Sequence, residues 1–94
     1  MALRHLVLFR LHDGLGDDSA ADAIDALRRL ANVPGVSSLQ VERSLDERKG
    51  TVIVENLEVA DEEALLAFRE HPIHVEVVTF MRTIADWWVG DYLE

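Results

Sequence analysis

The chain has 94 residues, of which 49% are hydrophobic, and a formal net charge of -9 at pH 7. This length predicts a single domain over residues 1–94, which would bury only about 60–68% of the surface of the unfolded chain. Nine basic residues scattered among eighteen acidic ones argue against a phosphate-binding surface, so nucleic acid is not an expected partner. The absence of cysteine excludes disulfides and thiol chemistry, and we expect a cytoplasmic protein.

Residues 3–11, LRHLVLFRL, form the first apolar segment and predict a β-strand. Three basic residues, Arg4, His5 and Arg10, interrupt this segment, so we expect neither a signal peptide nor a membrane span, and no membrane partner. The middle of the strand is apolar on both faces. We therefore expect helices on one face and, in so short a chain, a second copy of the protein on the other.

A helix and two strands are predicted next. Residues 19–32 place apolar side chains at helical spacing, after a turn that contains two glycines and ends on residues able to cap a helix. Residues 36–45 alternate between apolar and polar side chains, and residues 51–59 are rich in Val and Ile, so both predict strands. The loop at residues 46–50 between them predicts an antiparallel hairpin.

The last third of the chain predicts a broken helix and a final strand. Residues 62–70 form a short helix, capped by Asp61 or a near neighbour. A second helix begins at Pro72, because proline disfavours helix at the residue before it but suits a first helical position. Residues 86–94 form a strand that returns beside the first and third. The order βαββαβ predicts an α+β, ferredoxin-like sandwich with helices on one face of the sheet.

Three polar residues, His5, His74 and Asp91, are predicted to converge on the helix-covered face of this sheet. A carboxylate that accepts the N–H of one imidazole nitrogen leaves the other nitrogen as a base, which is the pairing that acid–base catalysis requires. Asp91 would be desolvated there and would need a donor, so we expect His74 within hydrogen-bond reach of it and His5 in the same cavity. Each of the three could equally be a hydrogen-bonded core residue.

Other kinds of site have little support in the sequence. His71 and His74 are three residues apart, but metal sites usually need three or four ligands, and neither cysteine nor an HExxH motif accompanies them. No P-loop, GxGxxG or GxSxG motif is present. We therefore expect no metal and no cofactor.

Three segments together, RHLVLFRL, HPIH and DWWVGDYL, resemble the Dabb family, the stress-responsive dimeric α/β-barrel domain. The resemblance covers essentially the whole chain. It implies a ferredoxin-like subunit whose sheet packs against that of a second copy, in agreement with the two-faced first strand. The family includes a plant polyketide cyclase that needs no cofactor, and the resemblance assigns its general base to His74, its orienting carboxylate to Asp91 and its strand histidine to His5.

We also expect a substrate pocket around Phe68, His71, Leu27, Trp87 and Val89. The cyclase carries tyrosines where this chain has Phe68 and, nearby, Leu27, so the same cyclisation is not implied.

Three functional hypotheses remain open. The first is a cofactor-independent cyclase or lyase acting on a small aromatic or polyketide-like ligand. The second is a non-catalytic stress-responsive dimer that binds a ligand or has a structural role, and the third is a cofactor-free monooxygenase of a related barrel type. A cavity around His74 of about 300 Å³ or more would favour an enzyme over a structural role.

Overall fold

The structure is a computed structural model that describes residues 2–94. It confirms the predicted α+β, ferredoxin-like fold, with eight elements in chain order: β1 (Leu3–Leu11), α1 (Asp17–Arg28), a 3-10 turn η1 (Arg29–Asn32), β2 (Ser38–Arg43), β3 (Val52–Val59), α2 (Glu62–Glu70), α3 (Pro72–Met81) and β4 (Ala85–Leu93). The helix expected over residues 19–32 begins two residues earlier and tightens into η1 over its last turn. Across the described residues, no helix is both long and apolar enough to cross a membrane.

The sheet has the order β2-β3-β1-β4, and every neighbouring pair is antiparallel. The expectation that the last strand lies beside both the first and the third is wrong for the third, because β1 lies between β3 and β4. The register pairs His5 with Asp91 on β4 and with Leu57 on β3. This register determines the geometry of the candidate site.

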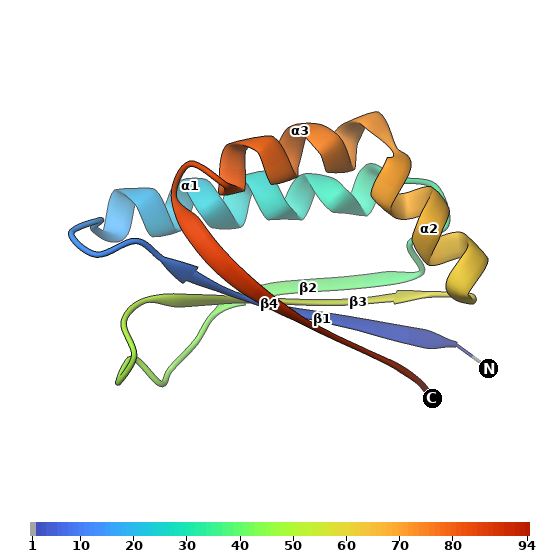
Figure 1. The fold of residues 1–94 in the computed structure, drawn as a ribbon, viewed down its shortest axis with the longest axis horizontal. Coiled ribbons are helices and arrows are strands. Elements are labelled where there is room, and N and C mark those ends of the chain that lie inside the picture. The colour runs from blue at the N-terminus through green and yellow to red at the C-terminus, as the bar shows by residue number, and fades with distance from the viewer. Residues whose placement is uncertain (1) are drawn as a thin grey trace.

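The two faces of the sheet differ in what covers them. All three α-helices lie on one side (Figure 1), where they bury the odd-numbered side chains of β1 and β3. The other side carries no helix (Figure 1), and two apolar side chains that pair across β1 and β4 are exposed there, Leu8 by 48% and Trp88 by 62%. A monomer therefore leaves an apolar sheet face in contact with water.

The break between α2 and α3 has a local cause. His71 has extended backbone angles (φ -66°, ψ 139°), which is the conformation that a following proline favours. Its Nδ1 accepts a hydrogen bond from the amide of Ile73 at 3.1 Å, so His71 caps α3. At the other end of α2, the predicted cap is confirmed, because Asp61 accepts a hydrogen bond from the amide of Ala64 at 2.8 Å.

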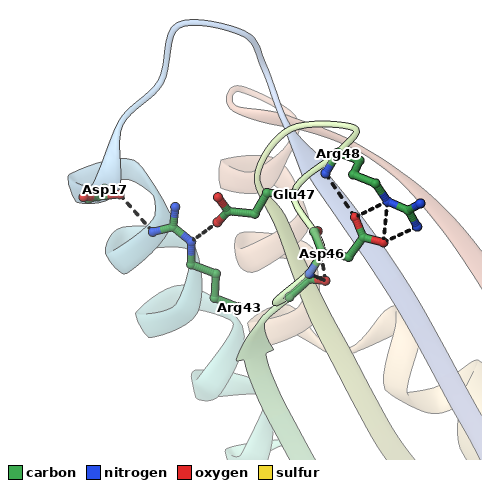
Figure 2. A network of polar contacts seen from close by, with 6 residues as sticks. Asp17, Arg43, Asp46, Glu47 and Arg48 are labelled. Carbon is green, nitrogen blue, oxygen red and sulfur yellow. Dashed lines mark hydrogen bonds and ion pairs between the residues drawn. The ribbon is translucent and has the colours of Figure 1, made fainter.

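The start of α1 differs from the prediction. Its N-cap is Gly16 and no side chain caps it, although the turn was expected to end on capping residues. Asp17 instead forms an ion pair with Arg43 at the end of β2, at 2.9 Å, and Arg43 also binds Glu47 of the following loop at 3.0 Å (Figure 2). The negative charge of Asp17 still lies in the first turn of α1, where it interacts favourably with the helix dipole.

Candidate functional site

A cavity of about 190 Å³ lies between the helix-covered face of the sheet and the helices. Its polar lining comes from His5 on β1, Glu55 on β3, Arg69 on α2, His74 on α3, and Arg82 directly after α3. Leu27, Trp87 and Val89, three residues predicted to line a pocket, contribute to its apolar lining. The structure therefore brings His5 and His74 into one cavity.

Asp91 has a different partner from the one expected. Its Oδ1 accepts a hydrogen bond from Nδ1 of His5 at 2.5 Å, and its Oδ2 pairs with Arg69 at 3.1 Å. No hydrogen bond joins Asp91 to His74 in the described residues, so the predicted His74–Asp91 pair is wrong. The reason is the strand register, which places His5 directly opposite Asp91, while His74 lies on α3 in the layer above.

The backbone of α2 holds His74 instead. Its Nδ1 donates a hydrogen bond to the carbonyl oxygen of Arg69, at 2.9 Å. This carbonyl lies in the last turn of α2, and the break at Pro72 leaves it without its usual helical partner, because the amide of Ile73 binds His71. Nε2 of the neutral ring then carries the lone pair.

The surroundings of His74 keep its ring neutral. Burial lowers the pKa of His74 from its ordinary value of 6.5, and the nearby charges of His5 and Arg69 act in the same direction. The hydrogen bond to the Arg69 carbonyl opposes this shift but is the smaller effect. An imidazole of this kind can act as a base near neutral pH.

Phe68 and His71, also predicted as pocket residues, lie outside the lining of the cavity. Phe68 is only 1% exposed and packs behind both histidines, with its ring centre 4.7 Å from that of His74 and 5.9 Å from that of His5. His71 serves as the cap of α3. Both residues therefore position the site without facing the cavity.

Glu55 was not predicted from the sequence, although it is 2% exposed and lines the cavity from β3. Its Oε2 lies 3.5 Å from Nε2 of His5 and has no hydrogen-bond partner. A signal was present in the sequence, since the alternation of residues 51–59 places Glu55 on the same face as Ile53 and Leu57. A single acidic residue on an apolar strand face indicates a buried carboxyl group.

Burial raises the pKa of Glu55 to about 8, and the charge of Asp91 adds to this effect. An acid whose pKa is raised by folding stabilises the fold most at pH values below its unfolded pKa, and this contribution is lost as the pH rises through the folded pKa. We therefore expect the free energy of unfolding to fall between pH 4.5 and about pH 8 relative to that of Glu55→Gln, which does not titrate. Urea titrations across this range test the prediction, and a constant difference would contradict it.

The size of the cavity restricts what it can hold. Its volume is below the roughly 300 Å³ taken to favour an enzyme, which supports the structural hypothesis on this one criterion. A cavity of about 150 Å³ in a protein interior can nevertheless bind benzene. The cavity is therefore comparable in volume with one that holds a single-ring molecule and is small for an extended polyketide chain.

The described residues contain no group of three or more histidine, aspartate or glutamate side chains placed to hold a metal ion. The two histidines of the HPIH segment have separate structural roles, His71 as a helix cap and His74 as a donor to Arg69. A site without metal or cofactor remains a prediction.

Comparisons with known proteins agree with the fold. The sequence model of the Dabb family, described as the stress responsive A/B barrel domain, matches residues 3–93. An uncharacterised protein of Streptomyces coelicolor, SCO4036, is 32% identical over 94 residues, which cover 96% of this chain and 97% of that protein.

Two solved structures show the same fold at low sequence identity. One, from Thermobifida fusca, is a dimeric ferredoxin-like protein of unknown function, with a TM-score of 0.87 and 22% identity over 100% of this chain and 92% of that one. The other is a hydroxynitrile lyase from Passiflora edulis, with a TM-score of 0.84 and 18% identity over 99% of this chain and 93% of that one.

Proposed function

The chain belongs to the Dabb family of stress responsive A/B barrel domains, and on this basis we propose that it is a cytoplasmic homodimer whose cavity performs cofactor-independent acid–base chemistry on a small carbonyl compound. The observation that supports this proposal most is the state of His74. Its ring is held through Nδ1, its pKa is lowered and it lines a cavity of ligand size. A neutral imidazole in such a position can take a proton from a carbon next to a carbonyl group.

Lyase or cyclase chemistry fits this arrangement, because both reactions need a base and a means of stabilising charge on an oxygen atom. In this proposal Arg69 and Arg82, which both line the cavity, stabilise the charge on the oxygen atom. The hydroxynitrile lyase of similar fold supports the same class of reaction. In this proposal His5 and Asp91 form a supporting pair, with Arg69 bridging Asp91 to the carbonyl that holds His74.

Deuterium exchange at the methyl group of acetophenone in heavy water tests the proposed chemistry. Acetophenone has a single ring, and its methyl hydrogens lie next to a carbonyl group. We expect the protein to accelerate this exchange, observed by proton NMR, with saturation as the ketone concentration rises. Exchange no faster than that of an equal concentration of imidazole would contradict the proposal.

The second candidate function is a non-catalytic dimer that binds a ligand. The small volume of the cavity favours it. Saturable binding of acetophenone without accelerated exchange is its expected result, so the same experiment separates the two functions.

Dimerisation through the open sheet face is the remaining part of the proposal. Leu8 and Trp88 are exposed side by side on this face, and the neighbouring Leu6 and Val54 extend the apolar surface. The similar Thermobifida fusca protein is described as dimeric. Packing against a second copy would remove this surface from water, which stabilises association.

We expect Leu8→Glu to convert the dimer into a folded monomer at micromolar concentration. The new carboxylate would be desolvated in the interface without a partner, whereas in the monomer it points into water. Sedimentation velocity gives the mass, and circular dichroism reports whether the subunit remains folded. The matched control is Leu66→Glu on α2, because Leu66 is exposed to a similar extent, 56%, on the helical side. A dimeric Leu8→Glu protein would contradict this interface.

A further inference from the structure

The mechanism proposed above leaves one polar group of the cavity without a role. Glu55 is only 2% exposed, and its Oε2 has no hydrogen-bond partner in the described structure. Nε2 of His5 lies 3.5 Å from this oxygen, which exceeds the usual hydrogen-bond range of about 2.7–3.2 Å. Buried polar atoms without a partner cost free energy, and a hydrogen bond to a bound ligand would offset this cost.

We propose that the Glu55 carboxyl group donates a hydrogen bond to the carbonyl oxygen of an uncharged, single-ring ligand bound in this cavity. The inference deepens the proposed function, because it assigns the ligand class and a recognition residue to the same site. Glu55 comes from β3 and His74 from α3, so a ligand between them contacts an acid on the sheet and a base on the helical layer. The described residues supply no other carboxyl group to the cavity lining.

The proton needed for this hydrogen bond is present at neutral pH. Burial, assisted by the charge of Asp91, raises the pKa of Glu55 to about 8, so the group is mainly a carboxylic acid at pH 7. Five titratable or charged residues surround the Glu55 carboxyl group. They are His5 on β1, Asp91 on β4, Arg69 on α2, His74 on α3 and Arg82 directly after α3. A neutral acid among them can donate a hydrogen bond to an acceptor oxygen of the ligand, which an ionised carboxylate cannot do.

The acid and the base together complete a proton transfer. His74 takes a proton from the carbon next to the ligand carbonyl, and the electron pair of that C–H bond forms the carbon–carbon double bond of an enol. The π electron pair of the C=O bond moves onto the oxygen, which takes the proton from Glu55 and becomes the hydroxyl group of the enol. The products are the neutral enol, an imidazolium at His74 and a carboxylate at Glu55, so charge and protons balance.

A pair of ligands with the same shape tests the hydrogen bond. Acetophenone carries an oxygen where α-methylstyrene carries a CH₂ group, and both contain one ring. We expect the protein to bind acetophenone about tenfold more tightly, as measured by NMR titration, which corresponds to about 1.4 kcal/mol for one buried hydrogen bond. Equal affinity for the two ligands would overturn the inference.

Two substitutions at one position assign the preference to Glu55. Glu55→Gln keeps an N–H donor of similar size, so we expect it to retain the preference for acetophenone within about twofold. Glu55→Leu removes the donor and should abolish the preference, although its apolar side chain suits the buried position. A Glu55→Leu protein that still prefers acetophenone would assign recognition to another group, such as Arg69 or Arg82, and would overturn the inference.

The protonation state is measured independently, by infrared difference spectroscopy between the wild type and Glu55→Gln at pH 7. The expected result is the carbonyl band of a protonated carboxylic acid in the wild type alone, and its absence would overturn the inference. These results distinguish a failure of the Glu55 inference from a failure of the proposed function. Binding without accelerated exchange removes the role of His74 as a base, whereas a lost preference for the ketone removes the role of Glu55 as a donor.

Discussion

Replacing His74 by alanine is expected to lower the rate of acetophenone exchange by about 10²- to 10⁴-fold, the usual contribution of a positioned general base. The rate in the wild type should rise with pH through the lowered pKa of His74, which lies below 6.5, because only the neutral ring accepts a proton. It should then fall as Glu55 ionises around pH 8. Exchange rates measured from acidic to alkaline pH test both the predicted rise and the predicted fall.

His12→Ala is the matched control. His12 is also an imidazole, but it lies at the end of β1 near Asp86, away from the lining of the cavity. Its replacement should leave both the rate and the pH profile unchanged. If His74→Ala exchanged as fast as the wild type, His74 would not be the base.

Phe68→Ala should lower the free energy of unfolding by about 3–5 kcal/mol, the usual cost of removing a fully buried phenylalanine ring. Phe68 is among the largest fully buried side chains and contacts the rings of both His5 and His74. Its loss should therefore also free His74 to rotate and lower the exchange rate. Urea denaturation followed by circular dichroism gives the stability.

Phe80→Ala provides the comparison, because Phe80 lies on α3 and is 37% exposed. We expect it to cost less than half as much as Phe68→Ala. If the two substitutions lowered the free energy of unfolding equally, the packing of Phe68 against the two histidines would not contribute more to stability than the packing of Phe80.

The order of the elements could be predicted because their signals are local. Alternation in residues 3–11, helical spacing after Gly16 and the proline at position 72 each depend on a few neighbouring residues. The side of β1 on which the last strand pairs depends on contacts across 86 residues, as between His5 and Asp91, and no local pattern fixes it. The uncapped start of α1 also escaped prediction, since a long-range ion pair to Arg43 replaces the local cap.

The difference between local signals and long-range contacts also explains which features of the candidate site could be predicted. The sequence placed His5, His74 and Asp91 on the correct side of the sheet, because strand alternation and helix position determine the side. It assigned Asp91 to the wrong histidine, because that choice depends on register. Glu55 was overlooked although the alternation of β3 places it on the buried face, since valine and isoleucine dominate that segment.

The short connection between α2 and α3 limits how this protein can vary. His74 is held by a carbonyl only five positions earlier, and the turn at Pro72 fixes the path between them. Inserting one residue into this connection would rotate the imidazole by about 100° around the axis of α3, away from both the carbonyl and the cavity. An insertion before Asp61 would leave the connection between α2 and α3 unchanged, so the hydrogen bond from His74 to the Arg69 carbonyl would be kept. Length variation among relatives should therefore concentrate in the loops before α2 and between β2 and β3, and should spare the five residues that end at His74.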